Sequence, residues 1–481
     1  MNNNLIFIKS VFDKINENNV NYCHWKSTDH LDASFKGETD FDILVDRSDT
    51  FKLESILNNI GFIRARTPDL RTYPCVEDYV YYDSKIQKWY HFHLHNQLPC
   101  GDRWVKSYHL PIEKFILENK VYLEEYSIFN IDPMSEYLFF IVRMHMKWRL
   151  PMRKKSFVKE NEYLRKRASG SSYDLKLHPL FFDEIKPIYK LLKQGIYNVS
   201  YSKQYCLKRK LKQFRRMNKI FFNIIAFIRY IYRVNIETQR RLFNKKDNGR
   251  RSLINGGKLV AFIGMDGSGK STMLDLSATQ FSKQINVAKV FLGTGRSGSH
   301  PLRRLIFKLA DFLPVRKKNK IGKVKDTVTK PSLAKLIWIY LCLRDRKAEL
   351  NKMKRGVANG SLVLVDRWPQ SIIENVADYP KLSNFSRSSG LTGYLSRLEF
   401  TFYEDLKAYE PDLLLWFDID PKTSLVRKPG ELDIDEAAFY KDSLEKYTDD
   451  CKFNFYRIDA EKTLSEVSDT TNSLLWKVLS E

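Results

Sequence analysis

The stretch best suited to chemistry is GMDGSGKST, residues 264–272, which has the spacing G-x-x-x-x-G-K-[ST]. Glycines in such a loop let backbone N–H groups point inward at phosphate oxygens, and the N-terminus of a following helix adds its dipole. Lys270 is placed to reach the β- and γ-phosphates, and the Ser271 hydroxyl is placed to ligate Mg²⁺. The stretch therefore predicts a phosphate-binding loop, or P-loop, that binds ATP with Mg²⁺.

The flanking sequence supplies the elements that this loop needs. The apolar run Lys258–Ile263 predicts a buried strand before it, and the residues from Thr272 onward predict a helix after it. A glycine-rich turn that matches by accident would not have strand, loop and helix in this order. The residues expected at the nucleotide are Gly264, Met265, Gly267, Ser268, Gly269, Lys270, Ser271 and Thr272.

An acidic residue ends a second apolar run, SLVLVDRW at 361–368. The carboxyl ends of parallel strands converge beside a phosphate loop, so Asp366 is predicted to hold Mg²⁺ directly or through water. Arg367 would project into the same crevice and neutralise phosphate charge. Without the P-loop upstream, an Asp-Arg pair after a strand would be an ordinary turn.

Two further basic positions come from a helix and a loop. The helix around RDRKAEL, residues 344–350, carries arginines that can grip a phosphate through two hydrogen bonds, a weak signal by itself. After the buried strand that starts at Leu413, residues 424–433 place a Pro-Gly break among cations. This pattern predicts a mobile, positively charged lid, and a lid arginine that closes on the transferred phosphoryl group stabilises its charge.

Taken in order, these motifs resemble the thymidylate kinase family, from Lys258 to the C-terminus. The carrying stretches are GMDGSGKST (264–272), RDRKAEL (344–350), GSLVLVDRW (360–368), EPDLLLWFDIDPKTSLVRKPGELD (410–433) and RIDAEKTLSEV (457–467). The resemblance implies an ATP-dependent phosphotransferase that acts on a nucleoside monophosphate or related phosphorylated acceptor, and it implies a homodimer.

The resemblance also assigns roles to single residues. Asp266 would help to position the sugar of the acceptor nucleotide, and Arg346 would bind the acceptor phosphate. The P-loop has no arginine among its variable positions, so the lid would supply the catalytic cation. Arg427 is expected in that role, with Lys428 second. Where the family has an Arg-Glu-Pro-Gly-Gly-Thr stretch, this chain has residues 290–299, VFLGTGRSGS, which leaves thymidylate itself in question.

Near the N-terminus, Asp40 and Asp42 stand two residues apart in GETDFDILVD, residues 37–46. Neighbours at i and i+2 on a strand face the same side, and two such carboxylates predict a divalent metal site. Preceded by HWKS, the motif resembles the nucleotidyltransferase superfamily, which uses a third carboxylate on a later strand. The candidate strand Trp89–His95 offers three alternating histidines instead. They would ligate metal, contact phosphates or form a half-buried polar face.

The chain has 481 residues and a formal charge of +24, which indicates anionic partners. Residues 201–251 contain sixteen Lys or Arg and two acidic residues, and they include the apolar run Ile220–Ile228. That run is too short to span a bilayer, which needs about 18 apolar residues. It predicts either contact with an anionic membrane surface or a linker helix that packs its apolar side on a neighbour.

Composition and motifs together predict an α/β protein in three parts. A P-loop kinase, 251–481, has a parallel sheet covered by helices; it follows a small α+β nucleotidyltransferase-like domain, 1–125, and a basic helical segment, 126–250. Six scattered cysteines and an N-terminus without signal-peptide features favour the cytoplasm, with peripheral contact at the inner membrane face.

Two alternatives to nucleotide phosphorylation stay open. One is a kinase for a sugar or lipid-linked glycan in surface polysaccharide biosynthesis, which the added N-terminal domain and the basic helices would suit. The other is a non-catalytic nucleotide-binding regulator that acts at a membrane or on nucleic acid. Turnover of ATP with a defined acceptor separates the two classes.

Overall fold

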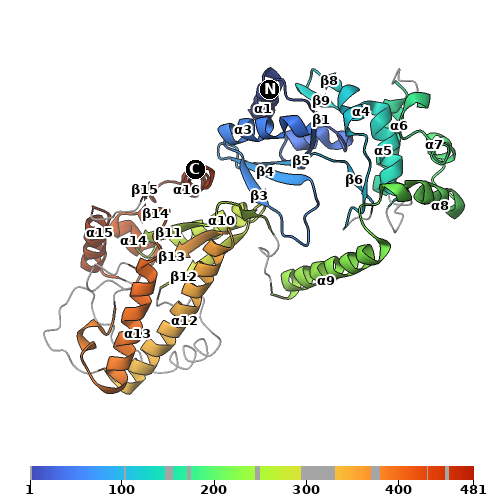
Figure 1. Cartoon of the computed structure of the whole chain (residues 1–481). Helices are drawn as coiled ribbons and strands as arrows, with labels where there is room; N and C mark the ends of the chain where they lie inside the picture. The colour runs from blue at the N-terminus through green and yellow to red at the C-terminus, as the bar shows by residue number, and fades with distance from the viewer. Residues whose placement is uncertain are drawn as a thin grey trace. The chain divides into compact units, whose positions relative to one another are not determined.

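The structure is a computed structural model that describes residues 3–101, 105–146, 155–170, 175–243, 250–293, 331–369, 380–430, 432–449 and 454–481. The chain divides into two compact units, Met1–Arg251 and Ser252–Glu481 (Figure 1). Both combine helices with sheets, so the prediction of an α/β protein is confirmed. The cysteines within the described ranges are free thiols.

The first unit is built on a mixed sheet with strand order β3-β4-β5-β2-β1-β9-β8. The main strands of this sheet are β1 (Tyr22–His24), β2 (Phe41–Val45), β3 (Ile63–Arg66), β4 (Val76–Asp83), β5 (Lys88–His95), β8 (Val121–Leu123) and β9 (Ile128–Asn130). A separate pair of strands is formed by β6 (Pro99–Cys100) and β7 (Tyr108–His109). Strands β2 and β5 run parallel, while β4 and β5 are antiparallel.

Helices cover both faces of this sheet. One hydrophobic core joins α1 (Asn3–Glu17), α2 (Leu31–Phe35) and α3 (Thr50–Ile60) to side chains such as Phe41 and Phe92. A second core joins Trp25 and Leu44 to the helices that follow, so one core crosses the boundary expected at residue 125. Those helices are α4 (Glu113–Glu118), α5 (Pro133–His145), α6 (Lys155–Ala168), α7 (Lys186–Lys193) and α8 (Tyr201–Lys210), and α9 (Lys219–Phe243) continues the chain.

Local sequence explains several boundaries. Helix α5 begins where the Asp132 side chain accepts a hydrogen bond from the Ser135 N–H, with Pro133 in its first turn. Short 3₁₀ turns complete the unit: Thr28–His30, Arg47–Asp49, Leu175–Leu177 and Leu211–Phe214. The segment 126–250, predicted to be basic and helical, contains α5 to α9 among the residues described, and it begins with strand β9 of the sheet.

The second unit has a parallel sheet with strand order β12-β13-β11-β14-β15. Its strands are β11 (Lys258–Gly264), β12 (Val287–Phe291), β13 (Leu362–Asp366), β14 (Leu413–Asp418) and β15 (Phe455–Asp459); the short β10 (Ser252–Leu253) precedes them. Near-continuous apolar runs in β11, β13 and β14 suit strands that are buried on both faces.

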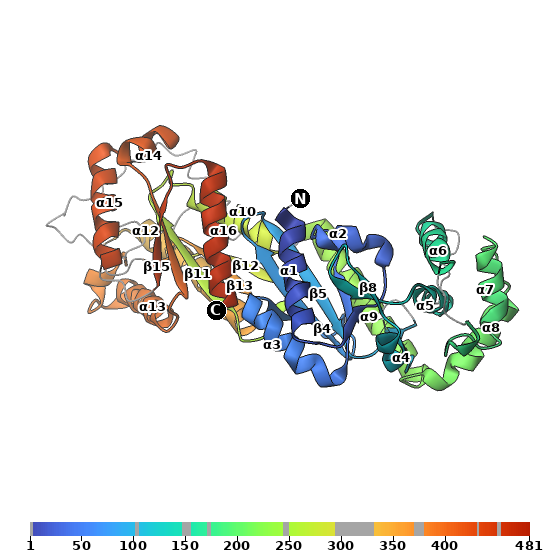
Figure 2. The ribbon, with the colours of Figure 1, turned by 90° about the horizontal axis from the view of Figure 1, so that it is seen from above.

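Helices lie on both faces of the parallel sheet: α10 and α16 on one, α12 and α13 on the other (Figure 2). Their bounds are α10 (Lys270–Phe281), α12 (Leu333–Ala358), α13 (Gly390–Lys407), α14 (Pro421–Arg427), α15 (Ile434–Asp449) and α16 (Leu464–Ser480), with a 3₁₀ turn at Ser383–Phe385. A reciprocal pair of hydrogen bonds between Thr463 and Glu466 caps the start of α16. The predicted parallel sheet covered by helices is confirmed for this unit.

Candidate functional site

The P-loop connects the end of β11 to the start of α10. Gly264, Gly267 and Gly269 all have positive φ angles, a backbone region that side chains disfavour. A Cβ on Gly264 would lie 2.6 Å from the Phe417 carbonyl oxygen, so only glycine fits there, whereas one on Gly269 would meet nothing within 4 Å. The loop is therefore packed against the sheet on one side and open on the other, as a phosphate cradle requires.

Charged side chains gather at this loop. The Lys270 ammonium donates to the Met265 carbonyl oxygen at 3.0 Å and lies 3.4 Å from the Asp266 carboxylate. Burial raises the pKa of Asp266, but neighbouring cations outweigh burial and hold that pKa below its ordinary value. These cations are Lys270, Arg367 and Lys428. Burial also lowers the pKa of Lys270. The loop thus has an excess of positive charge where phosphates would bind.

The Ser271 hydroxyl donates to Asp366 Oδ2 at 2.7 Å. This contact joins the start of α10 to the end of β13. In the sheet register Asp366 stands opposite Phe262 of β11, the strand that leads into the P-loop. The second oxygen, Asp366 Oδ1, is buried and has no hydrogen-bond partner among the residues that the structure describes. A hydroxyl beside an unsatisfied carboxylate oxygen is a donor set that suits Mg²⁺, so these residues fit the predicted ion.

Arg367 turns from the end of β13 toward the P-loop. Its φ of 60° lies in the left-handed region, which is uncommon for a residue with a side chain. Its N–H donates to the Phe262 carbonyl, and its guanidinium donates to Asp266 Oδ1 at 2.6 Å. Gly293 makes room for this arginine, because a Cβ there would lie 2.5 Å from Arg367 Cδ. Arg367 therefore lies beside the P-loop, as expected from the sequence.

The segment predicted to be a lid begins with α14, which packs directly on the P-loop. The Ser424 hydroxyl donates to the Asp266 carbonyl oxygen at 2.6 Å, and a Cβ on Gly267 would meet the Ser424 carbonyl oxygen at 3.0 Å. The Arg427 guanidinium donates to the Ala460 carbonyl oxygen at 3.1 Å. Lys428 acts electrostatically on Asp266. In this conformation Lys428 is thus a lid cation whose charge reaches the P-loop.

Arg346 occupies an aromatic box between α12 and α13. Its guanidinium lies over the rings of Phe402, at 4.4 Å, and Tyr403, at 5.1 Å, and it donates to the Tyr403 hydroxyl at 3.1 Å. Its Nε and second terminal nitrogen are buried and have no hydrogen-bond partner among the described residues. No contact described joins Arg346 to the P-loop cluster. Sequence reasoning missed this box, since Phe402 and Tyr403 lie outside every motif, and it gave Ser424 no role although Ser424 begins the predicted lid.

The N-terminal carboxylates face the histidines of β5. In the sheet register His93 stands between Asp42 of β2 and Asp78 of β4. His93 Nδ1 lies 3.5 Å from Asp42 and 4.0 Å from Asp40, so both carboxylates share one side, as predicted. His95 Nε2 lies 3.2 Å from Asp42.

Asp78 is the acidic residue that sequence reasoning missed. Its Oδ1 lies 2.8 Å from His91 Nε2 and 3.1 Å from His93 Nε2. Two cations also join the cluster: Arg251 Nε lies 3.1 Å from Asp78, and Lys26 Nζ lies 2.9 Å from Asp42. The only sequence signal for Asp78 was that it is an acidic residue at a buried position of an aromatic strand.

Burial would raise the pKa values of all three carboxyls in this cluster, yet their partners lower them. The pKa of Asp40 falls to about 2, mainly through His91, and the pKa of Asp42 falls well below its usual range through Lys26 and the histidines. The pKa of His93 rises to about 9 despite burial, because it is hydrogen-bonded to Asp42 and Asp78. The carboxylates are therefore ionised at neutral pH.

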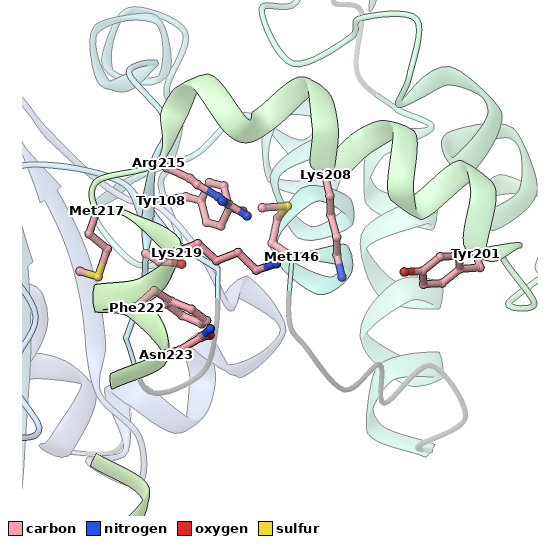
Figure 3. A pocket seen from close by; sticks show the side chains of 10 residues that line it. Tyr108, Met146, Tyr201, Lys208, Arg215, Met217, Lys219, Phe222 and Asn223 are labelled. Atoms are coloured by element: carbon pink, nitrogen blue, oxygen red, sulfur yellow. The ribbon is translucent and has the colours of Figure 1, made fainter. Parts of the chain in front are cut away.

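The basic segment carries a pocket of about 530 Å³ near the start of α9 (Figure 3). Lys208 and Lys219 extend into it from α8 and from the first turn of α9, and Arg215 stacks over Tyr108 beside it. None of its described lining residues is acidic. They are Ser107, Tyr108, Met146, Tyr201, Lys208, Arg215, Met217, Lys219, Phe222 and Asn223.

Helix α9 continues from this pocket and exposes a stripe of large apolar side chains. Its members recur every three or four residues: Ile220, Ile224, Phe227, Ile231 and Val234. Each is between 47% and 67% exposed, so no described part of the chain buries the stripe. Within the described residues, no helix combines the length and the apolar character needed to cross a membrane.

Comparison with known proteins agrees with the P-loop geometry. The chain is 29% identical over 175 residues to the uncharacterized ATP-binding protein YghR of Escherichia coli strain K12, a match that covers 36% of this chain and 69% of YghR. It is 29% identical over 221 residues to the thymidylate kinase of Shewanella sp. strain ANA-3, covering 44% and 91%. The thymidylate kinase of Nostoc punctiforme is 28% identical over 180 residues, covering 37% and 71%.

No protein-family model matches the chain. The similarities nevertheless support a relationship to P-loop kinases and a nucleotide-binding, kinase-like function. They cover less than half of this chain. The acceptor and the role of the N-terminal unit must therefore be argued from the residues themselves.

Proposed function

We propose that the unit Ser252–Glu481 is an ATP- and Mg²⁺-dependent phosphotransferase that transfers the γ-phosphoryl group of ATP to a nucleoside monophosphate or a related phosphorylated acceptor. The observation that carries the proposal is the Ser271–Asp366 hydrogen bond of 2.7 Å at the end of a glycine cradle, with Asp366 Oδ1 left unsatisfied. Hydroxyl and carboxylate at this position are the two protein ligands that a P-loop provides for Mg²⁺.

The P-loop residues bind and neutralise the phosphates. Backbone N–H groups of the loop and of the first turn of α10 point at the phosphate oxygens, and Lys270 places a full charge on the transferred group. Ser271 and Asp366 would hold Mg²⁺, and the ion would supply positive charge that neutralises the charge developing on the phosphates. Met265, Ser268 and Thr272 complete the loop around the nucleotide.

Two sets of cations would divide the remaining work. Arg367 lies beside the P-loop and would neutralise phosphate charge, while a lid residue, Arg427 or Lys428, would close on the equatorial oxygens. Movement of α14 would be needed to free Arg427 from the Ala460 carbonyl. Lys428 already acts electrostatically on Asp266 in the conformation described, which favours it as the lid cation.

Arg346 would bind the phosphate of the acceptor. Two of its guanidinium nitrogens are buried without partners, and a dianionic phosphate can accept from both at once. The Arg346 guanidinium lies over the rings of Phe402 and Tyr403, and these rings hold its plane in a fixed orientation. Asp266, whose carboxylate lies between Lys270 and Arg367, would hydrogen-bond the acceptor sugar.

The experiment that tests this function is transfer of labelled γ-phosphoryl from ATP to a panel of acceptors by the full chain with Mg²⁺. The panel holds the nucleoside monophosphates and, separately, phospho-sugars and lipid-linked glycans. Label in a nucleoside monophosphate supports the proposal. Label confined to a sugar or glycan would replace the acceptor class. ATP binding with no transfer to any acceptor would favour a regulator.

We also propose that α9, which lies within the basic residues 201–251, contacts an anionic membrane surface at the inner face of the cytoplasmic membrane. Apolar side chains at helical spacing would enter the headgroup region, and the lysines of the adjoining acid-free pocket would meet lipid phosphates.

A homodimer is proposed from the family resemblance alone, and sedimentation equilibrium of the full chain tests it.

A further inference from the structure

The cluster of imidazoles and carboxylates on the N-terminal sheet takes no part in the phosphotransfer proposed above. Two overlapping sets of side chains place their donor atoms within 4.8 Å of one another. One set is Asp40, His91 and His93, and the other is Asp42, His93 and His95. Because His93 Nδ1 belongs to both and has one lone pair, the cluster can hold a single ion through that atom.

Asp78 fixes the direction in which the imidazoles present their lone pairs. It lies at hydrogen-bond distance from Nε2 of both His91 and His93, so these Nε2 atoms carry the protons when the rings are neutral. The Nδ1 atom of a neutral His93 then has its lone pair free to coordinate and faces Asp42, whereas His91 Nδ1 lies at hydrogen-bond distance from Asp40 and Arg251. Carboxylates that hold ligand imidazoles from behind in this way are typical of metal centres.

With neutral imidazoles and no metal ion these contacts would be unfavourable. A lone pair on His93 Nδ1 would face the Asp42 carboxylate, an acceptor opposite an acceptor. Lys26 and Arg251 balance two of the three carboxylates, which leaves a formal charge of −1 when the imidazoles are neutral. Protonated imidazoles would relieve the conflict, and so would one divalent ion.

The distances suit ligands around one ion. Side-chain atoms bound at about 2.1 Å to the same ion lie roughly 3.0–4.2 Å apart. His93 Nδ1 and His95 Nε2 lie 3.5 Å and 3.2 Å from Asp42 Oδ1. By contrast, His91 Nδ1 lies 2.7 Å from Asp40, which is an ordinary hydrogen bond. The ring of His95 is held edge-on against Trp25, with ring centres 5.0 Å apart.

We propose that Asp42, His93 and His95 form a divalent transition-metal site, with Asp40 beside it and Asp78 as the residue that orients the imidazoles. Two imidazoles and a carboxylate favour Zn²⁺, Mn²⁺, Fe²⁺ or Co²⁺ over Mg²⁺, which prefers oxygen ligands. This refines the sequence prediction of a divalent metal at Asp40 and Asp42. It also differs from the all-carboxylate pattern that the nucleotidyltransferase resemblance implies.

The test measures metal, not activity, and it uses the full chain. Protein carrying Asp366→Asn, which removes the carboxylate from the P-loop site, is stripped with a chelator and dialysed without nucleotide against Zn²⁺, Mn²⁺, Co²⁺ or Mg²⁺. Bound metal is determined by mass spectrometry, and Co²⁺ is also followed by its visible absorption. We expect about one transition-metal ion per chain and no retained Mg²⁺.

Three further substitutions in that background separate ligands from bystanders. His93→Gln should lose the ion, with Asp42→Asn as the second variant if His93→Gln does not fold. Asp78→Asn should keep the ion but bind it roughly 10–100-fold more weakly. His109→Gln is the matched control, because His109 pairs with Glu113 outside the cluster, and it should bind normally.

Two results with the transition metals would overturn the proposal, and one result with Mg²⁺ would as well. One is that the parent protein retains none of the transition metals. The other is that folded His93→Gln and Asp42→Asn both retain a full equivalent, as judged with native circular dichroism. Retention of Mg²⁺ alone would point instead to an oxygen-ligand site and would equally overturn it. Because phosphotransfer is not the readout, failure here leaves the kinase proposal unaffected.

Discussion

At the P-loop, three cations surround Asp266 and a second carboxylate, Asp366, lies at Ser271, whereas on the N-terminal sheet three carboxylates share two cations and three imidazoles. The first arrangement leaves positive charge for a phosphate chain. The second leaves negative charge and ring nitrogens for a metal ion. Both use the same device: side chains at strand ends or on neighbouring strands, in register, converge on one side of a sheet.

The comparison shows how the sign of uncompensated charge indicates the kind of ligand. Within the described ranges, an atom in or beside each cluster has no hydrogen-bond partner: Asp366 Oδ1 in the second unit and His95 Nδ1 in the first. Buried polar atoms without partners are costly, so they are retained where a ligand or a function compensates. The P-loop site is also built from one contiguous motif, while the metal cluster draws on strands far apart in sequence.

The largest effect short of removing Lys270 should come from Asp366→Asn. The substitution keeps volume but removes the charge that would hold Mg²⁺, so the transfer rate should fall by about 10²–10³-fold. The melting temperature should move by no more than about 2–4 °C, which corresponds to about 1 kcal/mol for a unit of this size. Kinetics and calorimetry on the same preparation check both. A large drop in melting temperature with activity per folded molecule intact would make Asp366 a structural turn.

Arg346→Lys should give the next largest effect. Lysine keeps the charge but lacks the planar fork, so KM for the acceptor should rise by about 10–100-fold with little change in KM for ATP. Steady-state kinetics with each substrate varied measure this split. Tyr403→Phe is the control, since it removes only the hydroxyl that accepts from Arg346. Equal effects on both KM values would argue against a role in acceptor binding.

For α9 we expect a smaller change. Phe227→Glu should weaken co-sedimentation with acidic phospholipid vesicles by about tenfold, because it removes an exposed apolar group that would enter the headgroup region and adds a repelled charge. Binding of the unmodified chain should fall as salt rises. Phe51→Glu, at an exposed phenylalanine of α3, is the matched control and should bind like the unmodified chain. No binding to acidic vesicles at low salt would support the linker-helix interpretation.

The smallest effect should come from the Asp40→Asn/Asp42→Asn double variant. If the two units work independently, its phosphotransfer rate should stay within about twofold of the unmodified chain, as is usual for substitutions that share no partners. The same variant should lose the metal of the N-terminal cluster. Loss of phosphotransfer with the metal would show that the two sites are coupled, and the contrast between them would no longer be one of independent modules.

Sequence was sufficient where chemistry lies in one stretch of chain. Gly264 to Ser271 fixes strand, loop and helix together, and Asp366 follows because parallel strands end at the same edge. Same-side placement of Asp40 and Asp42 follows from strand alternation. The spacing of residues within one strand does not determine how that strand pairs with its neighbour. Asp78 was therefore missed, although it stands opposite His93 in the sheet. The aromatic box around Arg346 was missed for the same reason, since it depends on how α13 packs against α12.

Some expectations lie beyond the described residues or remain predictions. Most of the stretch 290–299, which departs from the thymidylate kinase pattern, falls outside the described residues. This stretch therefore does not help to identify the acceptor. Arg427 was expected to act on the phosphoryl group, yet its guanidinium binds a backbone carbonyl here. A lid changes contacts when its ligand binds, and the free sequence does not encode which conformation is populated.

The most direct test of the central claim is transfer of γ-phosphoryl from labelled ATP by the full chain and by Lys270→Ala, measured in parallel with Mg²⁺ and the acceptor found in the screen. Lys270 places a full positive charge on the transferred group, so its removal should reduce transfer by at least about 10²–10³-fold while the protein stays folded. Transfer and ATP consumption that persist in Lys270→Ala at nearly the unmodified rate would contradict the assignment of this site as a kinase.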